Sequence, residues 1–177
     1  PLYSSAASDV YKRQVLTQGI TGKVGSYHTL RCLNYGMGRD CFVGGVNPKR
    51  GGEIYEDMKI FATVSEAKAE TNANVSVLYV PPLLAADAII EAARAKIKLI
   101  VCITEGIPIN DMLRVRSFIR EHEPGALLLG PNCPGLITPG VLKVGIMPES
   151  IHTPGRIGIV SRLSLIHISE PTRPLYI

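Results

Sequence analysis

The sequence predicts an α/β fold with a doubly wound, mostly parallel sheet that carries helices on both faces. Short apolar runs rich in β-branched residues alternate with amphipathic segments, which is typical of repeated βαβ units. The run from Val75 to Val80 lacks strict alternation of apolar and polar residues, as expected of a strand buried on both faces. Turns rich in glycine and proline follow these runs. In open α/β sheets such loops line the ligand crevice.

The expected strands are short and are bounded by turn residues. They are placed at residues 15–18, 41–46, 75–80, 98–103, 126–129 and 142–146, with a further strand at 156–160. The last of them follows the turn from His152 to Gly155, where a second domain is expected to begin.

Three segments between the strands show the helical spacing of apolar residues. The first follows the strand at 15–18 and contains Tyr27, Leu30 and Leu33. The other two place these residues on one face each: Leu83, Ala86, Ile90 and Ala93, then Ile109, Met112, Val115 and Ile119. We expect these faces to cover the sheet.

The two ends of the chain read as translated adaptor DNA. The string GATGTGTATAAGAGACAG encodes Asp9 to Gln14, and its reverse complement encodes Leu163 to Ile168. One inverted repeat, similar to the mosaic end of transposase-based sequencing libraries, explains both ends better than two natural polar tails. We therefore expect residues 1–14 and 163–177 to be disordered tails of adaptor origin. Residues 15–150 are then one domain, and residues 151–162 are the start of a truncated second one.

Composition limits the classes of function. The net charge of +4 suits a small anionic ligand but is too weak and dispersed to indicate nucleic acid. The longest apolar stretches are too short for a membrane-spanning helix. The four cysteines form no CxxC pair and no zinc-site spacing with histidine, so no metal site is expected. Reduced thiols favour the cytosol or the mitochondrial matrix.

A glycine-rich loop follows the first expected strand. Gly19, Gly22 and Gly25 have the spacing GxxGxxG and lead into an amphipathic helical segment. Glycines let the backbone approach a pyrophosphate, and the N–H groups at the start of the helix bind its charge. The spacing differs from the common GxGxxG, so an ordinary strand-to-helix turn is the alternative. The position between a strand and a helix favours a phosphate loop.

The loop after the second expected strand bears on which nucleotide binds. An NAD site usually places an acidic residue near the end of that strand to bind the ribose hydroxyls. Here Lys49 and Arg50 stand within the turn from Asn47 to Gly52. Two cations suit a phosphate on the ribose, which coenzyme A carries at the 3′ position and NADP at the 2′ position. A solvated basic turn is the alternative.

Seven blocks in a fixed order resemble the α subunits of succinyl-CoA ligase. They are GITGKVG, GGVNPKRGG, LYVPP, CITEGIP, GPNCPGLITPG, KVGIMP and PGRIGIVSR, and they extend over essentially all of residues 15–162. TEGIP and GPNCPG are the most specific. The resemblance implies that residues 15–150 form a Rossmann-like domain that binds coenzyme A. It also implies that residues 151–162 begin a flavodoxin-like ligase domain.

The resemblance assigns cofactor contacts residue by residue. Those with the nucleotide phosphates fall on Thr21, Gly22, Lys23 and Val24. Arg50 stands where the family has a lysine in the glycine-rich turn, which keeps the charge but changes its shape. Lys49 beside it is the alternative for that role.

Two further blocks are implied to lie along the pantetheine arm and at its thiol. They are Ile103, Thr104 and Glu105 at the mouth of the fourth strand, and Asn132, Cys133 and Pro134 near the thiol. A carboxylate at the start of a helix is the alternative for Glu105. No histidine lies near Cys133 in the sequence, so no covalent role is expected for it. A cis peptide bond is expected before Pro134.

The resemblance also implies the reaction of the parent enzyme. Succinyl-CoA, phosphate and a nucleoside diphosphate are interconverted with succinate, coenzyme A and a nucleoside triphosphate, through a phosphohistidine on the second α domain. None of His28, His122, His152 and His167 corresponds to it, so this fragment, without catalytic residues, is expected to bind and not to turn over.

A β subunit is expected to complete a heterodimer or heterotetramer and to carry the nucleotide and magnesium. The family acts in the tricarboxylic acid cycle. The implied compartment is the mitochondrial matrix in a eukaryote and the cytoplasm in a bacterium.

Two other classes of function remain as alternatives. An NADP-binding oxidoreductase module is compatible with the basic turn, although no pattern of catalytic acid and base accompanies it. A non-catalytic CoA-binding regulatory domain is the other. The parent sequence beyond residue 162 distinguishes this regulatory domain from a ligase subunit, because the ligase family continues with Ser-Gly-Thr and a full second domain.

Overall fold

The computed structural model describes residues 13–161. The expected tails at residues 1–12 and 163–177, and Arg162, lie outside this range. Gln14, which the prediction assigned to the N-terminal tail, lies within the described residues and is hydrogen-bonded. Its carbonyl oxygen accepts hydrogen bonds from the backbone N–H groups of Asn74 (3.0 Å) and Val75 (3.1 Å), next to the first strand pair.

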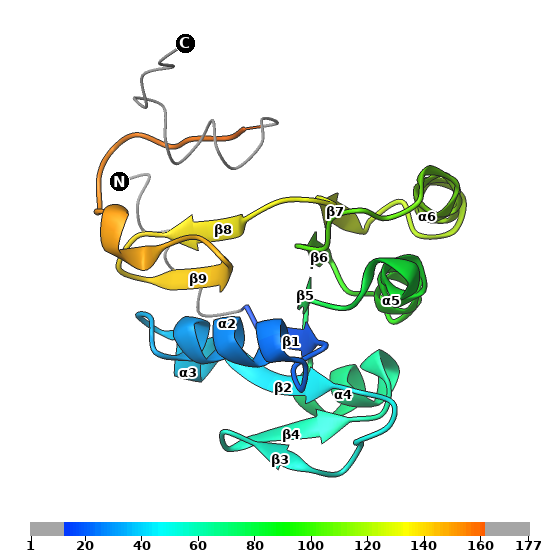
Figure 1. The fold of residues 1–177 in the computed structure, drawn as a ribbon, viewed down its shortest axis with the longest axis horizontal. Coiled ribbons are helices and arrows are strands. Elements are labelled where there is room, and N and C mark those ends of the chain that lie inside the picture. Colours follow the sequence, from blue (N-terminus) through cyan, green and yellow to red (C-terminus); the bar gives the residue numbers. More distant parts are fainter. Residues whose placement is uncertain (1–12, 162–177) are drawn as a thin grey trace.

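The described residues form a seven-stranded sheet in the order β3-β4-β2-β1-β5-β6-β7 (Figure 1). Its strands are β1 (Val15–Gln18), β2 (Phe42–Val46), β3 (Ile54–Tyr55), β4 (Met58–Phe61), β5 (Val75–Leu78), β6 (Leu99–Cys102) and β7 (Leu127–Leu129). All neighbouring pairs are parallel except the edge pair β3 and β4. The predicted doubly wound, Rossmann-like α/β class is confirmed.

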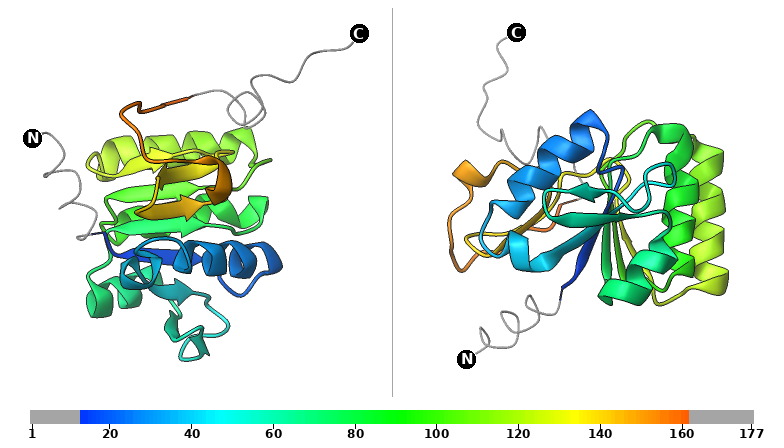
Figure 2. Two further views of the ribbon diagram at one scale, coloured as in Figure 1. Left: turned by 90° about the vertical axis from the view of Figure 1, so that its left-hand side faces the viewer. Right: turned by 90° about the horizontal axis from the view of Figure 1, so that it is seen from below.

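Helices cover both faces of this sheet (Figure 2). One face carries α2 (Lys23–Leu33), α3 (Gly38–Cys41) and an antiparallel hairpin of β8 (Gly135–Thr138) and β9 (Leu142–Gly145). The other face carries α4 (Val64–Thr71), α5 (Pro82–Arg94) and α6 (Ile109–His122). A short 3₁₀ helix, η1 (Glu149–Ile151), follows the hairpin.

Side chains of the central strands pack into two separate hydrophobic cores, one on each face of the sheet. Val15, Val77 and Val101 pack in the core beneath α2 and the hairpin. Leu16 and Leu78 point the other way, into the core beneath α4 and α5. Successive side chains of a strand point to opposite faces. The predicted burial of the strand at 75–80 on both faces is therefore confirmed for its β5 part.

Two elements missed by the sequence prediction have clear local signals. Helix α4 begins at a cap in which the Thr63 side chain accepts a hydrogen bond from the N–H of Glu66 (3.2 Å), and it ends at Asn72 in the left-handed conformation. The β3–β4 hairpin turns through Glu56 and Asp57, both with positive φ. These short elements lack the longer apolar periods on which the prediction depended.

Two predictions about strands and helix faces are wrong, and one expected strand is confirmed with a different pairing. The strand expected at 156–160 is absent from the described structure, where Val160 is 100% exposed and no neighbouring strand pairs with this segment. The strand expected at 142–146 exists as β9 but pairs with β8, outside the parallel sheet. Leu83 and Ile109, expected on the buried helix faces, are 76% and 78% exposed. Each lies in the first turn of its helix.

Candidate functional site

The carboxyl ends of β1, β2 and β5 surround the larger of two substantial cavities, with a volume of about 830 Å³. Thr21 and Gly22 contribute one wall, Asn47 and Pro48 a second, and Tyr79 to Pro81 a third; α5 closes the remaining side. Strands β1 and β5 are adjacent in the sheet, and their crossovers leave to opposite faces. This cavity therefore lies at the topological switch point, where open α/β sheets bind ligands.

The glycine loop packs backbone against backbone. Gly19 has φ +83°, and a Cβ there would lie 3.2 Å from the backbone of Tyr79 and Val80. A Cβ on Gly25 would overlap the carbonyl oxygen of Gly19 and lie 2.9 Å from its carbonyl carbon. The N–H of Gly22 donates to the same oxygen (3.0 Å). Glycines at positions 19 and 25 thus let α2 start against the end of β1.

The start of α2 is suited to an anion. Its cap residue, Gly22, provides no side-chain hydrogen bond, and no acidic residue lies in the first turn. The first N–H groups of a helix have no acceptor within the helix, and its dipole places partial positive charge there. Lys23 and Val24, both exposed, occupy the first two helical positions. The predicted phosphate loop therefore has uncapped donors facing solvent.

Asn47 joins the loop after β2 to the glycine loop. Its Nδ2 donates to Thr21 Oγ1 (2.5 Å), its Oδ1 accepts from the N–H of Lys49 (2.9 Å), and its own N–H donates to the carbonyl of Phe61 (3.0 Å). The sequence prediction named the turn that Asn47 opens but not this residue. An asparagine directly after a strand, able to bond its own backbone two residues on, was the available signal.

The predicted basic pair separates at this turn. Lys49 lines a smaller cavity of about 380 Å³ beside β4. Arg50 lines neither that cavity nor the larger one, and its guanidinium is bound to Glu53. This ion pair raises the pKa of Arg50 and lowers the pKa of Glu53. Both side chains are about half exposed.

The two predicted pantetheine blocks lie together, next to the end of β5. Thr104 Oγ1 donates to the carbonyl of Val80 (2.7 Å), and the N–H of Asn132 donates to the carbonyl of Thr104 (2.9 Å). Val80 lines the larger cavity, so these loops lie next to its wall, although none of residues 103–105 and 132–134 lines the cavity itself. Ile103 is half-buried, and Glu105 is exposed. Since α6 starts only at Ile109, Glu105 does not belong to its first turn.

The cis peptide bond expected before Pro134 lies elsewhere. It joins Gly130 and Pro131, at the turn where Gly130 has φ +100° and packs against the carbonyl of Cys102. A Cβ at that glycine would collide with this carbonyl, so the chain makes its sharp turn there and Pro134 follows in a trans bond.

Cys133 is positioned as a packed thiol. Its Sγ donates to the carbonyl of Cys102 (3.3 Å), and burial raises its pKa. A raised pKa leaves little thiolate, the nucleophilic form. Within the described residues no cluster of histidine, cysteine, aspartate and glutamate suited to a metal is present. Cys133 therefore packs against the end of β6 and lines neither of the two larger cavities.

Ion pairs from the buried Lys143 and from Arg31 to the half-buried Glu149 anchor the β8–β9 hairpin to α2. Lys143 of β9 is only 1% exposed, and its Nζ lies 2.7 Å from Oε2 of Glu149, which also binds Arg31 of α2. The hydrogen bond from Lys143, reinforced by Arg31, lowers the pKa of Glu149 to about 2. His28, one turn before Arg31, stacks on Tyr79 at 6.0 Å, and burial lowers its pKa. The contacts of Lys143, Glu149 and Arg31 hold the hairpin beside the candidate site.

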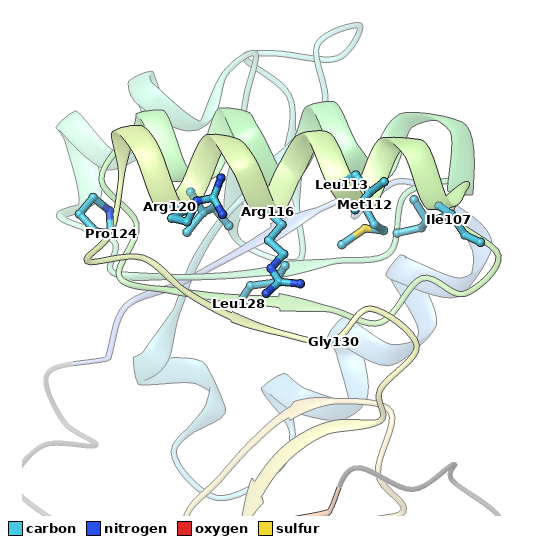
Figure 3. Close-up of a pocket in the computed structure, with 10 residues that line it drawn as sticks. Ile107, Met112, Leu113, Arg116, Arg120, Pro124, Leu128 and Gly130 are labelled. Atoms are coloured by element: carbon cyan, nitrogen blue, oxygen red, sulfur yellow. The ribbon is translucent and has the colours of Figure 1, made fainter.

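Figure 3 shows the second cavity, of about 720 Å³, along α6 and β7. Met112 and Leu128 represent its apolar lining, and Arg116 and Arg120 project beside them. None of the residues predicted for cofactor binding lines it. No helix of the described residues is long and apolar enough to cross a membrane.

Comparisons with known proteins give a family match. Residues 10–106 match the family model described as CoA binding domain. The chain is 54% identical over 149 residues to the α subunit of succinate–CoA ligase [ADP-forming] from Aquifex aeolicus, covering 84% of this chain and 48% of that relative. It is 51% identical over 151 residues to α subunit 2 of the same enzyme from Archaeoglobus fulgidus, covering 85% and 51%. The chain thus spans about half the length of these relatives.

A solved structure shows the same fold. The dinucleotide-forming acetyl-coenzyme A synthetase 1 of Ca. Korarchaeum cryptofilum superposes with a TM-score of 0.62 at 25% identity, over 78% of this chain and 30% of that chain. The family match includes the glycine loop, the basic turn and residues 103–105, but ends before residues 132–134.

Proposed function

Because this chain belongs to the CoA-binding domain family, we propose that residues 13–161 bind coenzyme A as the cofactor-binding part of a succinate–CoA ligase α subunit. One observation carries the proposal. The uncapped start of α2, approached closely by the glycine loop, opens beside a cavity of about 830 Å³. Free N–H groups at a helix start bind phosphate well. The site suits a long, phosphate-bearing cofactor.

Different residues of the described structure contact different parts of such a cofactor. The N–H groups of Lys23 and Val24, with the hydroxyl of Thr21, receive the pyrophosphate. Gly22, whose own N–H is bonded to the carbonyl of Gly19, has no side chain and lets the phosphates approach the backbone. The turn carrying Lys49 and Arg50 supplies charge for the ribose phosphate.

The loops at residues 103–105 and 132–134 extend along the pantetheine arm. Their support is the pair of hydrogen bonds that ties them to Val80, a residue of the cavity wall. Coenzyme A, once bound, supplies the thiol that the acyl group is transferred to, and these residues orient it and carry no proton in the reaction.

The reaction of the whole enzyme is a further part of the proposal. The relatives named above are ADP-forming succinate–CoA ligases, and we assign the parent of this chain the same interconversion, through a phosphohistidine on the other α domain. Among the described histidines, His28 is packed on Tyr79, and His122 lies at the end of α6. His152 directly follows η1, and none of the three histidines lines the larger cavity. Residues 13–161 are therefore assigned binding alone.

The partner and compartment follow from the same proposal. A β subunit would complete a heterodimer or heterotetramer and carry the nucleotide and magnesium, so the choice of nucleotide belongs to it. The compartment would be the mitochondrial matrix in a eukaryote or the cytoplasm in a bacterium. The names of the α-subunit relatives support the pairing in general terms.

The proposal predicts selective binding of coenzyme A by the 177-residue chain. Calorimetric titration should give tighter binding of coenzyme A than of 3′-dephospho-coenzyme A or NADP. The variant Arg50→Ala should weaken binding of coenzyme A about tenfold or more, since a charge-assisted hydrogen bond contributes about 1.5–3 kcal/mol. It should leave binding of 3′-dephospho-coenzyme A nearly unchanged.

The matched control is Arg39→Ala, which removes the same charge from an exposed side chain that bonds Asn34 (3.2 Å) and lines a different cavity. Its affinity for coenzyme A should equal that of the wild type. Preference for NADP would overturn the proposal in favour of an oxidoreductase module. Binding of none of the three nucleotides would contradict it as well.

A further inference from the structure

The turn from Arg50 to Glu53 is held by backbone hydrogen bonds and places the side chains of Arg50 and Glu53, which carry opposite charges, in contact. The N–H of Glu53 donates to the carbonyl of Arg50 (3.3 Å), and Gly52 between them has φ +91°, as a turn of this kind requires at its third position. The N–H of Gly52 donates to the carbonyl of Ile60 (2.8 Å), and the N–H of Ile60 donates to the carbonyl of Glu53 (2.8 Å). These bonds tie the turn to β4.

The side chains of this turn form a forked contact. Nε and Nη2 of Arg50 both donate to Oε2 of Glu53, at 2.8 and 2.5 Å. Two of the five guanidinium donors, on the edge that best matches a carboxylate or phosphate, are thereby used. Arg50 lines neither cavity next to the turn, although Pro48, two residues before it, lines both. The guanidinium of Arg50 is thus paired with Glu53 and lines neither cavity.

We propose that Glu53 is a resident competitor for the phosphate-binding cation: its carboxylate occupies Arg50 in the free protein and is exchanged for the ribose phosphate when coenzyme A binds. This inference rests on the proposed function. A guanidinium cannot offer the same two donors to two anions at once, so a phosphate that takes the Nε and Nη2 donors of Arg50 must displace Glu53. Glu53 thereby lowers the affinity for 3′-phosphorylated nucleotides, and acts on other ligands little.

The other acidic side chains beside the turn do not share this role. Glu70 pairs with Lys59 (2.6 Å), and Glu66 contributes its N–H to the cap at Thr63. Both line the smaller cavity, but the ion pair of Arg50 is formed with Glu53. Glu70→Gln is therefore a matched control, because it removes one exposed carboxylate from an ion pair nearby and leaves the contact of Arg50 intact.

The test is a double-mutant cycle with the 177-residue chain, read by calorimetric titration. Glu53→Gln should tighten binding of coenzyme A about two- to fivefold, the range that corresponds to releasing an exposed ion pair. It should leave binding of 3′-dephospho-coenzyme A unchanged. In the background of Arg50→Ala the same change should have no effect on either nucleotide, and Glu70→Gln should leave both affinities as in the wild type.

The outcomes separate this inference from the proposed function. Equal tightening by Glu70→Gln, or tightening that persists without Arg50 or without the 3′-phosphate, would reduce the effect to net charge and overturn the inference. So would an unchanged affinity in both Glu53→Gln and Glu53→Ala while the wild type binds coenzyme A. If the wild type binds no coenzyme A at all, the proposed function itself fails.

Discussion

Replacing Gly25 by alanine is expected to lower the affinity for coenzyme A by more than about tenfold and to destabilise the protein by about 1–3 kcal/mol. The added Cβ would overlap the carbonyl oxygen of Gly19, and backbone cannot yield as a flexible side chain can. The start of α2 would be pushed away from the glycine loop. The donors for the pyrophosphate and the packing of α2 would then be lost together.

The direction of the change in stability distinguishes close packing from helix propensity. Within a helix, alanine is normally more favourable than glycine by about 1 kcal/mol, so propensity alone predicts a more stable protein. Gly125→Ala is the control, because nothing lies within 4 Å of a Cβ there. Urea unfolding and titration with coenzyme A measure both effects. A Gly25→Ala protein as stable and as tightly binding as the control would show that the loop relaxes, and would refute the close-packing argument.

Removing the carboxylate of Glu149 is expected to destabilise the protein by about 3 kcal/mol, because it leaves Lys143 charged and buried without its partner. Glu149→Ala tests this in urea unfolding. The double variant Lys143→Met with Glu149→Gln should recover most of the loss, since a buried ion pair replaced by groups of similar size is often neutral. Glu121→Ala, which removes an exposed carboxylate, should unfold as the wild type does.

The same pair gives the unfolding free energy a defined dependence on pH. The pKa of Glu149 is about 2 in the folded protein, against 4.5 for an unperturbed glutamate. A lowered pKa means that the stabilisation is complete above about pH 4.5 and is lost as the pH falls toward 2. The wild type should therefore lose stability across this interval more steeply than Glu149→Ala. Parallel curves for the two proteins would contradict the assigned ion pair.

The sheet could be predicted largely from the sequence because its central strands are unambiguous. The runs that became β1, β5 and β6 are apolar, short and bounded by turn residues, and their burial on both faces removes the alternation of a surface strand. The glycine loop was equally readable, since its spacing and its place between a strand and a helix are both local properties. Other strands, such as β8 within a proline- and glycine-rich stretch, carry no comparable signal.

Some of the candidate binding residues could be predicted from the sequence, and others could not. Thr21 and Gly22 were predicted and line the larger cavity. Asn47 was missed, because its value lies in a hydrogen bond to a residue that is distant in the chain. The pairing of Arg50 with Glu53 also escaped prediction, although the two residues are close in sequence, because the direction of a long side chain depends on the turn that carries it.

The sequence by itself determined the central strands and the helices that follow them, the glycine loop after β1 and the positive charge of the turn after β2, since each depends on neighbouring residues. Only the tertiary structure decided how those parts meet. It placed the loops at residues 103–105 and 132–134 together, put the β8–β9 hairpin over α2, and buried Lys143 against Glu149. The physical reason is that these contacts join segments far apart in the chain, and local patterns of residues do not encode their partners.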